Sequence, residues 1–226
     1  MQRYNSFNLI HKALRAMMYD TALTLQQTDF TDPAESEKAL KKVETVIEQF
    51  EQHAYHEDAF MLPAIANFEP ALVAAFEEEH VVDNELGNRI KIVLKIFKSL
   101  ELDEEKVNCG SCVNKAFRDF IVFNLEHMAK EESDINQVLW KHFTDEELHR
   151  LNAKLTASIP LDQKMLTMKW MLRSINKVEA IEFLKAVKRS TPAFVFQSVI
   201  DLAETELPAE IKTEVLEGVM EIEMLA

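Results

Sequence analysis

The sequence predicts an all-α protein: an antiparallel, up-and-down four-helix bundle with an additional C-terminal helical extension. The chain has 226 residues, of which only 3 are glycine and 6 are proline. No run of β-branched residues alternates with polar residues over the length of a strand, and apolar residues recur instead at steps of three and four. Hydrophobic residues make up 47% of the chain, enough to form a substantial core.

Two helices are predicted in the first third of the chain. The first covers residues 6–27. The second opens at Asp32, which can cap it, with Pro33 in the first turn and Glu35 completing a capping box. We expect Pro63 to mark its end.

Two further long helices complete the predicted bundle. The third runs from residue 70 to 99, a polar connection follows at 101–110, and the fourth runs from Ser111 to His142. Short links between long helices make neighbours antiparallel. The bundle is expected to occupy residues 1–152.

Residues 153–226 are predicted to form a helical extension. Thr144 and Glu147 form a capping-box signature before it, and three prolines then separate further amphipathic segments: Pro160, Pro192 and Pro208. The sequence shows no convincing internal repeat. Histidine is absent from about residue 160 onward, so we expect packing or an interaction surface there, with Trp170, Phe194 and Phe196 in the core.

Composition excludes several classes of function. The formal net charge of −14 argues against a nucleic-acid partner, since binding phosphates requires clustered Lys and Arg. The N-terminal residues lack an apolar leader, and charged residues or Pro63 interrupt every apolar stretch, so no membrane association is expected. The two cysteines are too few for a disulfide scaffold, and a cytoplasmic location is predicted.

Polar residues interrupt the apolar faces of the second and fourth helices. Each helix carries a histidine and a glutamate spaced i,i+4, which places both side chains on one face. The inward positions of the second helix are Val43, Val46, Phe50, His53, Glu57 and Phe60. Those of the fourth are Val113, Phe117, Phe120, Asn124, His127, Glu131, Asp134 and Val138.

The first and third helices each add one inward histidine. His11 lies among Phe7, Leu14 and Met18, and His80 follows Val73 and Phe76 on the face that later carries Ile90, Leu94 and Phe97. A buried carboxylate is costly unless a cation pairs with it. Imidazole and carboxylate ligands suit iron, manganese or zinc, and six ligands are too many for one catalytic zinc. We therefore predict two metal ions, bridged by the glutamates and held by His11, His53, Glu57, His80, His127 and Glu131.

Two alternatives remain for these residues. Each histidine taken alone could be a hydrogen-bonded core residue without a metal. A ferritin-like site is suggested by Glu77-x-x-His80 and Glu146-x-x-His149. The second pair, however, falls on a separate short helix outside the bundle face, and the second and fourth helices lack this spacing.

The full pattern resembles the hemerythrin-like, or HHE cation-binding, domain. That family has His on its first helix, His-x-x-x-Glu on its second, His on its third and His-x-x-x-Glu on its fourth. The matching residues here are His11, His53 with Glu57, His80, and His127 with Glu131. The resemblance covers about residues 1–150 and implies a non-haem centre of two iron ions, with manganese or zinc as substitutes.

The chain departs from the family at two places. Oxygen-carrying hemerythrins have a fifth histidine one turn after the first histidine of the third helix, where this chain has Asn84. The resemblance therefore implies oxidation of the site by O2 rather than reversible oxygen carriage. The six-ligand set is similar to that of iron-centre repair proteins and of iron- or oxygen-sensing domains, although the cysteine-bearing N-terminal segment of the repair family is missing.

The predicted function is binding of, or reaction with, a diatomic ligand, O2 or NO, in sensing, iron handling or stress defence. Two alternatives stay open: a di-iron oxidase or peroxidase, and a helical interaction module with a structural metal. In the latter, the C-terminal helices would bind a protein partner or form a homodimer. No catalytic residue is assigned.

Several other polar residues could act beside the predicted ligands or elsewhere in the bundle. His56 and Glu132 lie about 100° from the centres of their helix faces and are expected to flank the site, with Glu132 a second choice to Glu131 as ligand. Tyr19 and Tyr55 are expected either beside the site or on the surface. Cys109 and Cys112 are placed just before or at the start of the fourth helix, where free backbone N–H groups could favour a thiolate.

Overall fold

In the computed structural model, which describes residues 3–220, every assigned element within that range is a helix, so the predicted all-α class is confirmed. Contacts group the chain into two compact units. One holds the residues up to Phe7 together with Met17–Ser158, and the other holds Asn8–Ala16 together with the residues from Ile159 onward. The predicted boundary between residues 152 and 153 stays a prediction, and residues 1–2 and 221–226 of the two predicted domains lie outside the described range.

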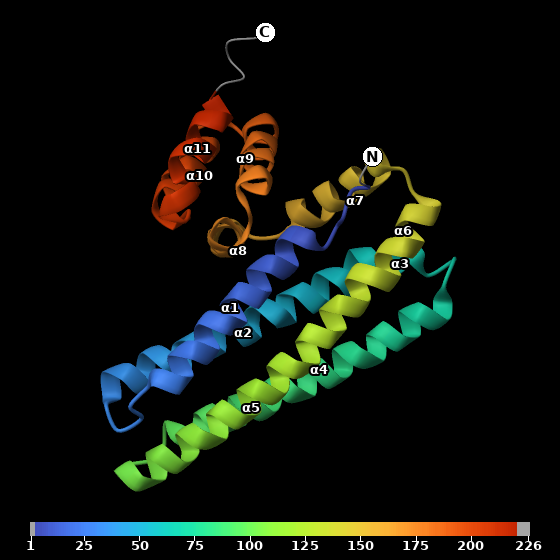
Figure 1. Cartoon of the computed structure of the whole chain (residues 1–226). Coiled ribbons are helices and arrows are strands. Elements are labelled where there is room, and N and C mark those ends of the chain that lie inside the picture. Colours follow the sequence, from blue (N-terminus) through green and yellow to red (C-terminus); the bar gives the residue numbers. More distant parts are fainter. Residues whose placement is uncertain (1–2, 221–226) are drawn as a thin grey trace. The chain divides into compact units, whose positions relative to one another are not determined.

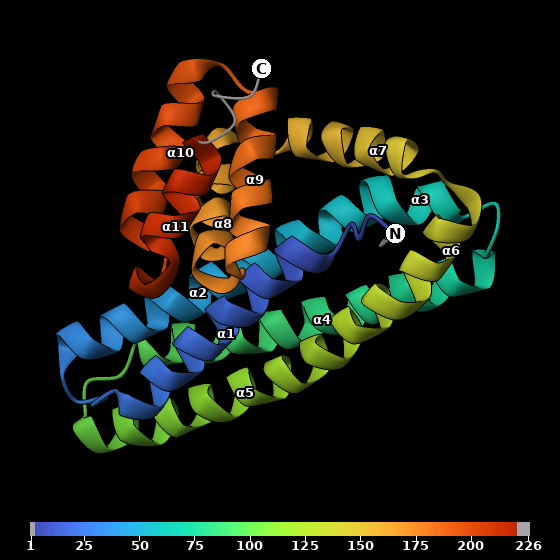
Figure 2. The ribbon, with the colours of Figure 1, turned by 45° about the horizontal axis from the view of Figure 1, so that its top comes forward.

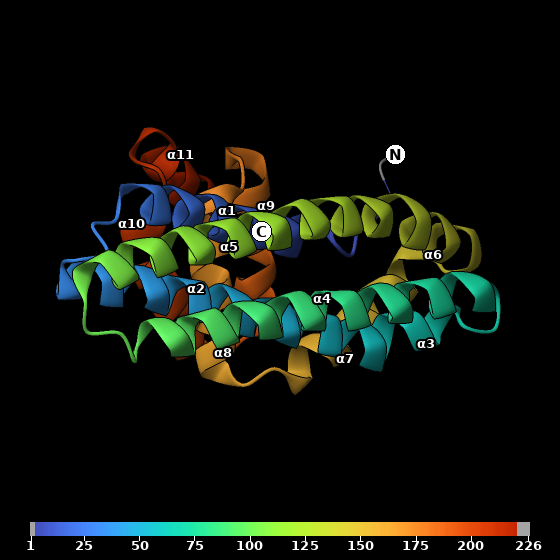
Figure 3. The same cartoon turned by 90° about the horizontal axis from the view of Figure 1, so that it is seen from below.

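The first unit is built from long helices that run alternately up and down (Figures 1 and 3). Short π-helical segments join two of the long helices to shorter α-helices. In chain order the elements are α1 (Asn8–Gln27), of which residues 8–16 group with the second unit, α2 (Pro33–His56), η1 (Glu57–Met61), α3 (Leu62–Ile65), α4 (Pro70–Phe97), α5 (Asp103–Lys130), η2 (Glu131–Ile135), α6 (Asn136–His142) and α7 (Asp145–Ser158).

Local capping residues set several helix starts. Asp32 caps α2, because its side chain accepts hydrogen bonds from the backbone N–H groups of Ala34 and Glu35. The expected capping box does not form there: the Glu35 carboxylate accepts instead from the backbone N–H of Asp29, at 3.0 Å. The predicted capping pair Thr144 and Glu147 does hydrogen-bond in both directions before α7.

Two predicted helix boundaries are wrong. The connection expected at 101–110 is largely helix, because α5 begins at Asp103 and three acidic residues in its first turn suit a helix N-terminus. Helix α2 was expected to end at Pro63. The chain instead passes through η1 into α3, where Pro63 occupies the first turn and requires no N–H hydrogen bond.

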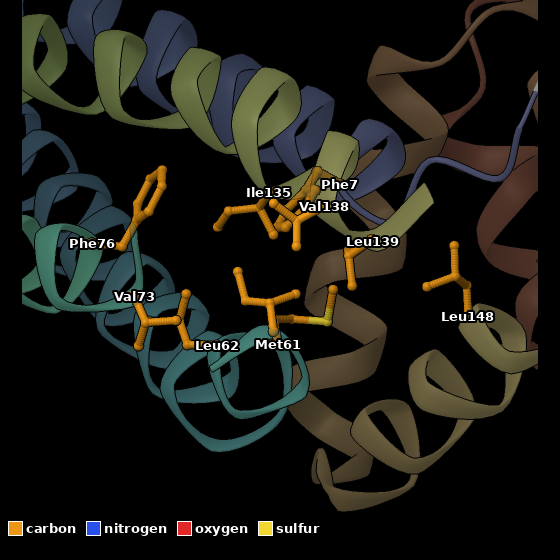
Figure 4. Packing of buried hydrophobic residues seen from close by; sticks show 10 residues of the cluster. Phe7, Met61, Leu62, Val73, Phe76, Ile135, Val138, Leu139 and Leu148 are labelled. Carbon is orange, nitrogen blue, oxygen red and sulfur yellow. The ribbon is translucent and has the colours of Figure 1, made fainter. Parts of the chain in front are cut away.

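An apolar cluster closes the end of the first unit at which η1 and η2 lie (Figure 4). Helix α7 joins it through Leu148, which is fully buried. Its buried members are Phe7, Met61, Leu62, Ile65, Val73, Phe76, Ile135, Val138, Leu139 and Leu148. The cluster keeps water away from the polar residues one turn further along the helices.

The C-terminal helices form a regular array (Figure 2). They are α8 (Leu161–Ser174), α9 (Lys177–Ser190), α10 (Ala193–Glu206) and α11 (Ala209–Met220), and their starts recur every 16 residues. Each is preceded by Pro160, Asn176, Pro192 or Pro208. This repeat was not predicted from the sequence, because what recurs is the spacing of the helix starts and of the buried apolar positions, with different residues in each repeat.

Apolar side chains alone fill the core of this array. Its buried residues are Leu172, Ile175, Ala180, Leu184, Val187, Val199, Ala203, Leu207, Val215 and Val219. Trp170 and Phe196 are partly buried, whereas Phe194 is 74% exposed, so its predicted core position is wrong. Between residues 3 and 220, no helix is long and apolar enough to cross a membrane.

Candidate metal centre

The structure brings the six predicted ligands into two overlapping groups. Glu57, His80, His127 and Glu131 form one, in which one ligand atom from each residue lies within 4.8 Å of the others. His11, His53, Glu57 and Glu131 form the other by the same measure. Glu57 and Glu131 belong to both groups, and this sharing is the arrangement that two bridged metal ions require.

The two shared glutamates each begin a π-helical segment. Glu57 is the first residue of η1 and Glu131 is the first residue of η2. A π-turn is wider than an α-turn, and such segments occur most often at functional sites. Both carboxylates are buried, with 2% exposure for Glu57 and 0% for Glu131.

Short contacts join the proposed ligand atoms, both within a helix and between helices. His127 Nε2 lies 3.0 Å from Glu131 Oε1, and His53 Nε2 lies 3.2 Å from Glu57 Oε1. His80 Nε2 lies 3.4 Å from the other oxygen of Glu57 and 3.8 Å from Glu131 Oε1. The Nε2 atoms of these histidines therefore face the shared carboxylates.

Two further carboxylates hold the outer nitrogens of His80 and His127. His80 Nδ1 lies 2.7 Å from Asp58 Oδ1, and His127 Nδ1 lies 2.7 Å from Glu79 Oε2. Lys130 donates to the second oxygen of Glu79 at 2.6 Å. An Nδ1–H that donates to a carboxylate leaves Nε2 to present its lone pair to a cation, as metal-binding histidines generally do.

The electrostatics of the centre follow from its burial. Burial and the negative charge of Glu131 raise the pKa of Glu57 well above its usual range. Burial opposes protonation of His80, but its contacts with Glu131, Glu57 and Asp58 raise its pKa to about 11. The pKa of His127 is also raised: burial opposes the charged form, and the contacts with Glu131 and Glu79 outweigh it. Positive charge is thus favoured beside the two carboxylates.

These residues fit a metal ion. Three atoms of the site are buried away from water and make no hydrogen bond of good geometry. They are both carboxylate oxygens of Glu57 and the Nε2 of His80. Buried polar atoms without such bonds are rare in native proteins and indicate an ion or ligand. Imidazole nitrogens and carboxylate oxygens are donors that iron, manganese and zinc accept.

Of the other residues expected near the centre, two are buried or partly buried and two are exposed. His56 is buried, and burial lowers its pKa, while Glu132 is partly buried next to the fully buried Glu131. Tyr19 and Tyr55 are 54% and 62% exposed, so of the two roles considered for them the structure favours the surface.

Asn84, one turn after His80, does not lie in the core, where the family pattern would place a fifth histidine. Asn84 is exposed, and its side-chain oxygen accepts from Asn88 Nδ2 at 2.8 Å, so it does not replace a fifth ligand in the core. Asp83 is the buried residue, at 5% exposure, and Asn124 Nδ2 donates to its Oδ1 at 2.6 Å. Sequence spacing could have found Asp83, since i+3 shares the face of His80 as i+4 does.

The ferritin-like alternative gains no support from the geometry. Glu77 and Glu146 are both exposed. His149 packs against the Tyr4 ring at 4.1 Å between centroids, and His142 stacks on Phe68 at 3.9 Å. Neither histidine belongs to the metal-ligand groups found among the described residues.

The two cysteines lie inside α5, so their predicted place at a helix start is wrong. Cys109 is partly buried, Cys112 is exposed, and both are free thiols. Burial raises the pKa of Cys109, which argues against a reactive thiolate. Gly110 between them has a packing role, because a Cβ there would clash with the ring of Phe30.

Comparisons with known proteins agree with this geometry. No curated protein and no solved structure matches the chain. Residues 4–139 match the family described as the Hemerythrin HHE cation binding domain, and this range contains all six residues of the two groups. The chain belongs to the hemerythrin HHE cation-binding family.

Proposed function

We propose that the protein is a non-haem di-iron protein that binds or reacts with O2 or NO. Its proposed ligands are His11, His53, Glu57, His80, His127 and Glu131. The observation that carries the proposal is the sharing of Glu57 and Glu131 between two four-residue groups. One group alone would fit a single ion, but two groups with common carboxylates fit a pair.

Different side chains would have different roles in such a centre. Glu57 and Glu131 offset the charge of two cations, and the two π-helical segments place these carboxylates between the histidines. Asp58 and Glu79 orient His80 and His127 through their Nδ1 atoms. The apolar cluster of Figure 4 keeps bulk water from one side of the site. When bound, iron supplies the electrons for reaction with a diatomic ligand.

The biological role follows from the missing fifth histidine. With six protein ligands for two ions, a coordination position stays open to solvent or to a small ligand. We therefore infer oxidation of the site by O2 rather than reversible oxygen carriage, as in a cytoplasmic sensor, an iron-handling protein or a stress-defence protein. An oxidase or peroxidase uses the same open position and is the runner-up within this chemistry.

A helical interaction module with a structural metal is the alternative from another class. Leu161, Val178 and Phe194 are 64%, 61% and 74% exposed near the starts of three C-terminal helices, which favours contact with a protein partner or a second copy. Under this alternative the metal stabilises the fold, but the loaded protein does not react with O2 or NO.

Anaerobic reconstitution with ferrous iron tests the proposal. Elemental analysis should give close to two iron ions per chain, and stopped-flow mixing with O2 should produce a ferric spectrum that vacuum does not reverse. Glu57→Gln should abolish loading, while the exposed control Glu77→Gln should load as the unmodified chain does. A folded protein that stays free of iron contradicts the proposal, and loading by zinc alone favours the structural alternative.

A further inference from the structure

A buried polar pair lies one helical turn from the proposed ligands. Asp83 follows His80 by three residues on α4, and Asn124 precedes His127 by three residues on α5. Both are buried, at 5% and 1% exposure. Asn124 Nδ2 donates to Asp83 Oδ1 at 2.6 Å and to the backbone oxygen of Phe120 at 3.1 Å. The carboxyl of Asp83 is therefore held in one orientation.

Apolar packing surrounds this polar pair, so its presence in the core requires an explanation. On the other side of the ligand layer, Phe76 packs against the His127 ring at 5.5 Å between centroids. Beyond the pair, Phe50 and Phe120 pack at 5.2 Å. Leucine at both positions would continue this apolar packing, and burying a carboxyl between apolar layers is costly. A role toward the site explains why the polar pair stands there.

The Asp83 carboxyl is close enough to interact electrically with the proposed ligands. Burial raises the pKa of Asp83, whereas the hydrogen bond from Asn124 and the charges of His127 and His80 lower it. It is absent from both four-residue ligand groups, so its oxygens lie too far away to complete either of them. Cations held by those groups would favour its ionised form. In the metal-loaded protein, Asp83 would therefore be a negative charge beside the proposed ligands.

We propose that Asp83, oriented by Asn124, is a specificity-determining residue of the metal centre. Its carboxylate accepts a hydrogen bond from a neutral ligand such as water and repels an anion at the ion held by His80 and His127. This inference rests on the proposed function. It assigns to Asp83 the place beside His80 that the family pattern had suggested for Asn84.

Cobalt(II) and azide provide a test that needs no turnover. Cobalt(II) reports its coordination through visible absorption, and azide is a small anion whose binding changes that spectrum. In the cobalt-loaded chain, Asp83→Asn removes the charge while keeping the shape and a partner for Asn124. It should tighten azide binding by roughly tenfold, the order expected when a neighbouring like charge is removed from a buried site.

Glu85→Gln is the matched control, because it removes the same charge from an exposed position on the same helix. Its azide affinity should stay within about twofold of the unmodified chain, since water and salt screen exposed charges. Cobalt affinity and melting temperature, measured for both variants, show whether each remains folded and loaded.

Every outcome decides the inference. Equal azide affinity in Asp83→Asn and the unmodified chain would overturn the role of Asp83 while leaving the metal centre intact. A folded Asp83→Asn chain that no longer holds cobalt would also overturn it, because Asp83 would then be needed for the metal itself. An unmodified chain that takes up no cobalt or iron would overturn the proposed function and this inference with it.

Discussion

The bundle and the C-terminal helices differ in whether they bury ionisable side chains. In the bundle, buried ionisable residues lie in or beside one layer between apolar residues: His11, His56, Glu57, His80, Asp83, His127 and Glu131. In helices α8 to α11, every buried residue is apolar. The C-terminal helices thus have a core that hydrophobic burial stabilises without help. The bundle has a layer that destabilises it unless a cation is present.

The buried ionisable layer of the bundle lowers its stability, so its presence is explained by a function and not by folding. A layer of like-charged carboxylates in a core is retained when binding a cation compensates for its cost. The bundle should therefore depend on metal for part of its stability, whereas the C-terminal array should not. Four measurements test this difference between the two regions.

The largest effect is expected for Glu57→Gln. Glu57 belongs to both ligand groups, so its loss should weaken metal binding by more than about 100-fold, beyond the effect typical of an outer partner. Without metal, the same change should raise the melting temperature by a few degrees, about 2–5 °C, because burial and repulsion by Glu131 both disfavour the Glu57 carboxylate, and Glu131 remains to pair with His80. Calorimetry of metal-free and loaded samples measures both.

The test is whether Glu57→Gln weakens metal binding and yet raises the melting temperature of the metal-free protein. The exposed substitution Glu182→Gln in α9 serves as the control and should change neither quantity. A Glu57→Gln chain that is less stable without metal would show that the carboxylate is satisfied by protein contacts alone.

Metal removal should loosen one region and spare the other. Backbone hydrogen exchange should speed up by at least about tenfold in residues 53–61 and 127–135, which carry ligands and the two π-helical segments. Exchange in residues 177–219 should stay the same, because their core contains no ionisable group. Mass spectrometry of peptides resolves these segments, and equal acceleration in both regions would contradict the comparison.

Rising pH should destabilise the metal-free protein but strengthen its binding of metal. In the metal-free protein the pKa of His80 is raised from 6.5 to about 11, so its stabilising contribution is complete below pH 6.5 and is lost as pH rises toward 11. Glu57, whose pKa is also raised by burial, adds a loss of the same sign above its ordinary range. Metal binding instead improves with pH, because ligands must be deprotonated.

Melting temperatures measured from pH 6.5 to 9 should therefore fall for the metal-free protein, and the difference between loaded and metal-free samples should widen. A metal-free melting temperature that rises with pH would show that His80 is neutral in the folded state.

Helical periodicity predicted the ligand layer but failed just beyond it. Steps of three and four gave Phe60 and Asp134 as the next inward residues, whereas the buried ones are Met61 and Ile135. A π-turn has more residues per turn than an α-turn, so each segment moves the inward face on by one residue. No residue pattern in the sequence marks these segments, because they arise where tertiary contacts place a carboxylate between helices.

Other features were predictable to different degrees. The inward faces follow from apolar spacing, which explains why His53, Glu57, His127 and Glu131 come together on the side of the helices that carries Phe50 and Phe120. The outer partners Asp58 and Glu79 were missed, since each contacts a histidine on another helix and sequence distance carries no sign of it. The 16-residue array was missed because its repeats share geometry more than identity.

The smallest effect is expected for Asn84→His. From the family resemblance, this change is expected to fill an open coordination position and slow oxidation of the iron. In the structure, Asn84 is exposed and bonds to Asn88, so a histidine there would extend into solvent. Iron content and the rate of oxidation by O2 should both remain within about twofold of the unmodified chain, since surface substitutions rarely disturb a buried site. A tenfold slower oxidation would mean that α4 rotates to bring position 84 inward when metal binds, and it would assign that position, instead of Asp83, to the centre.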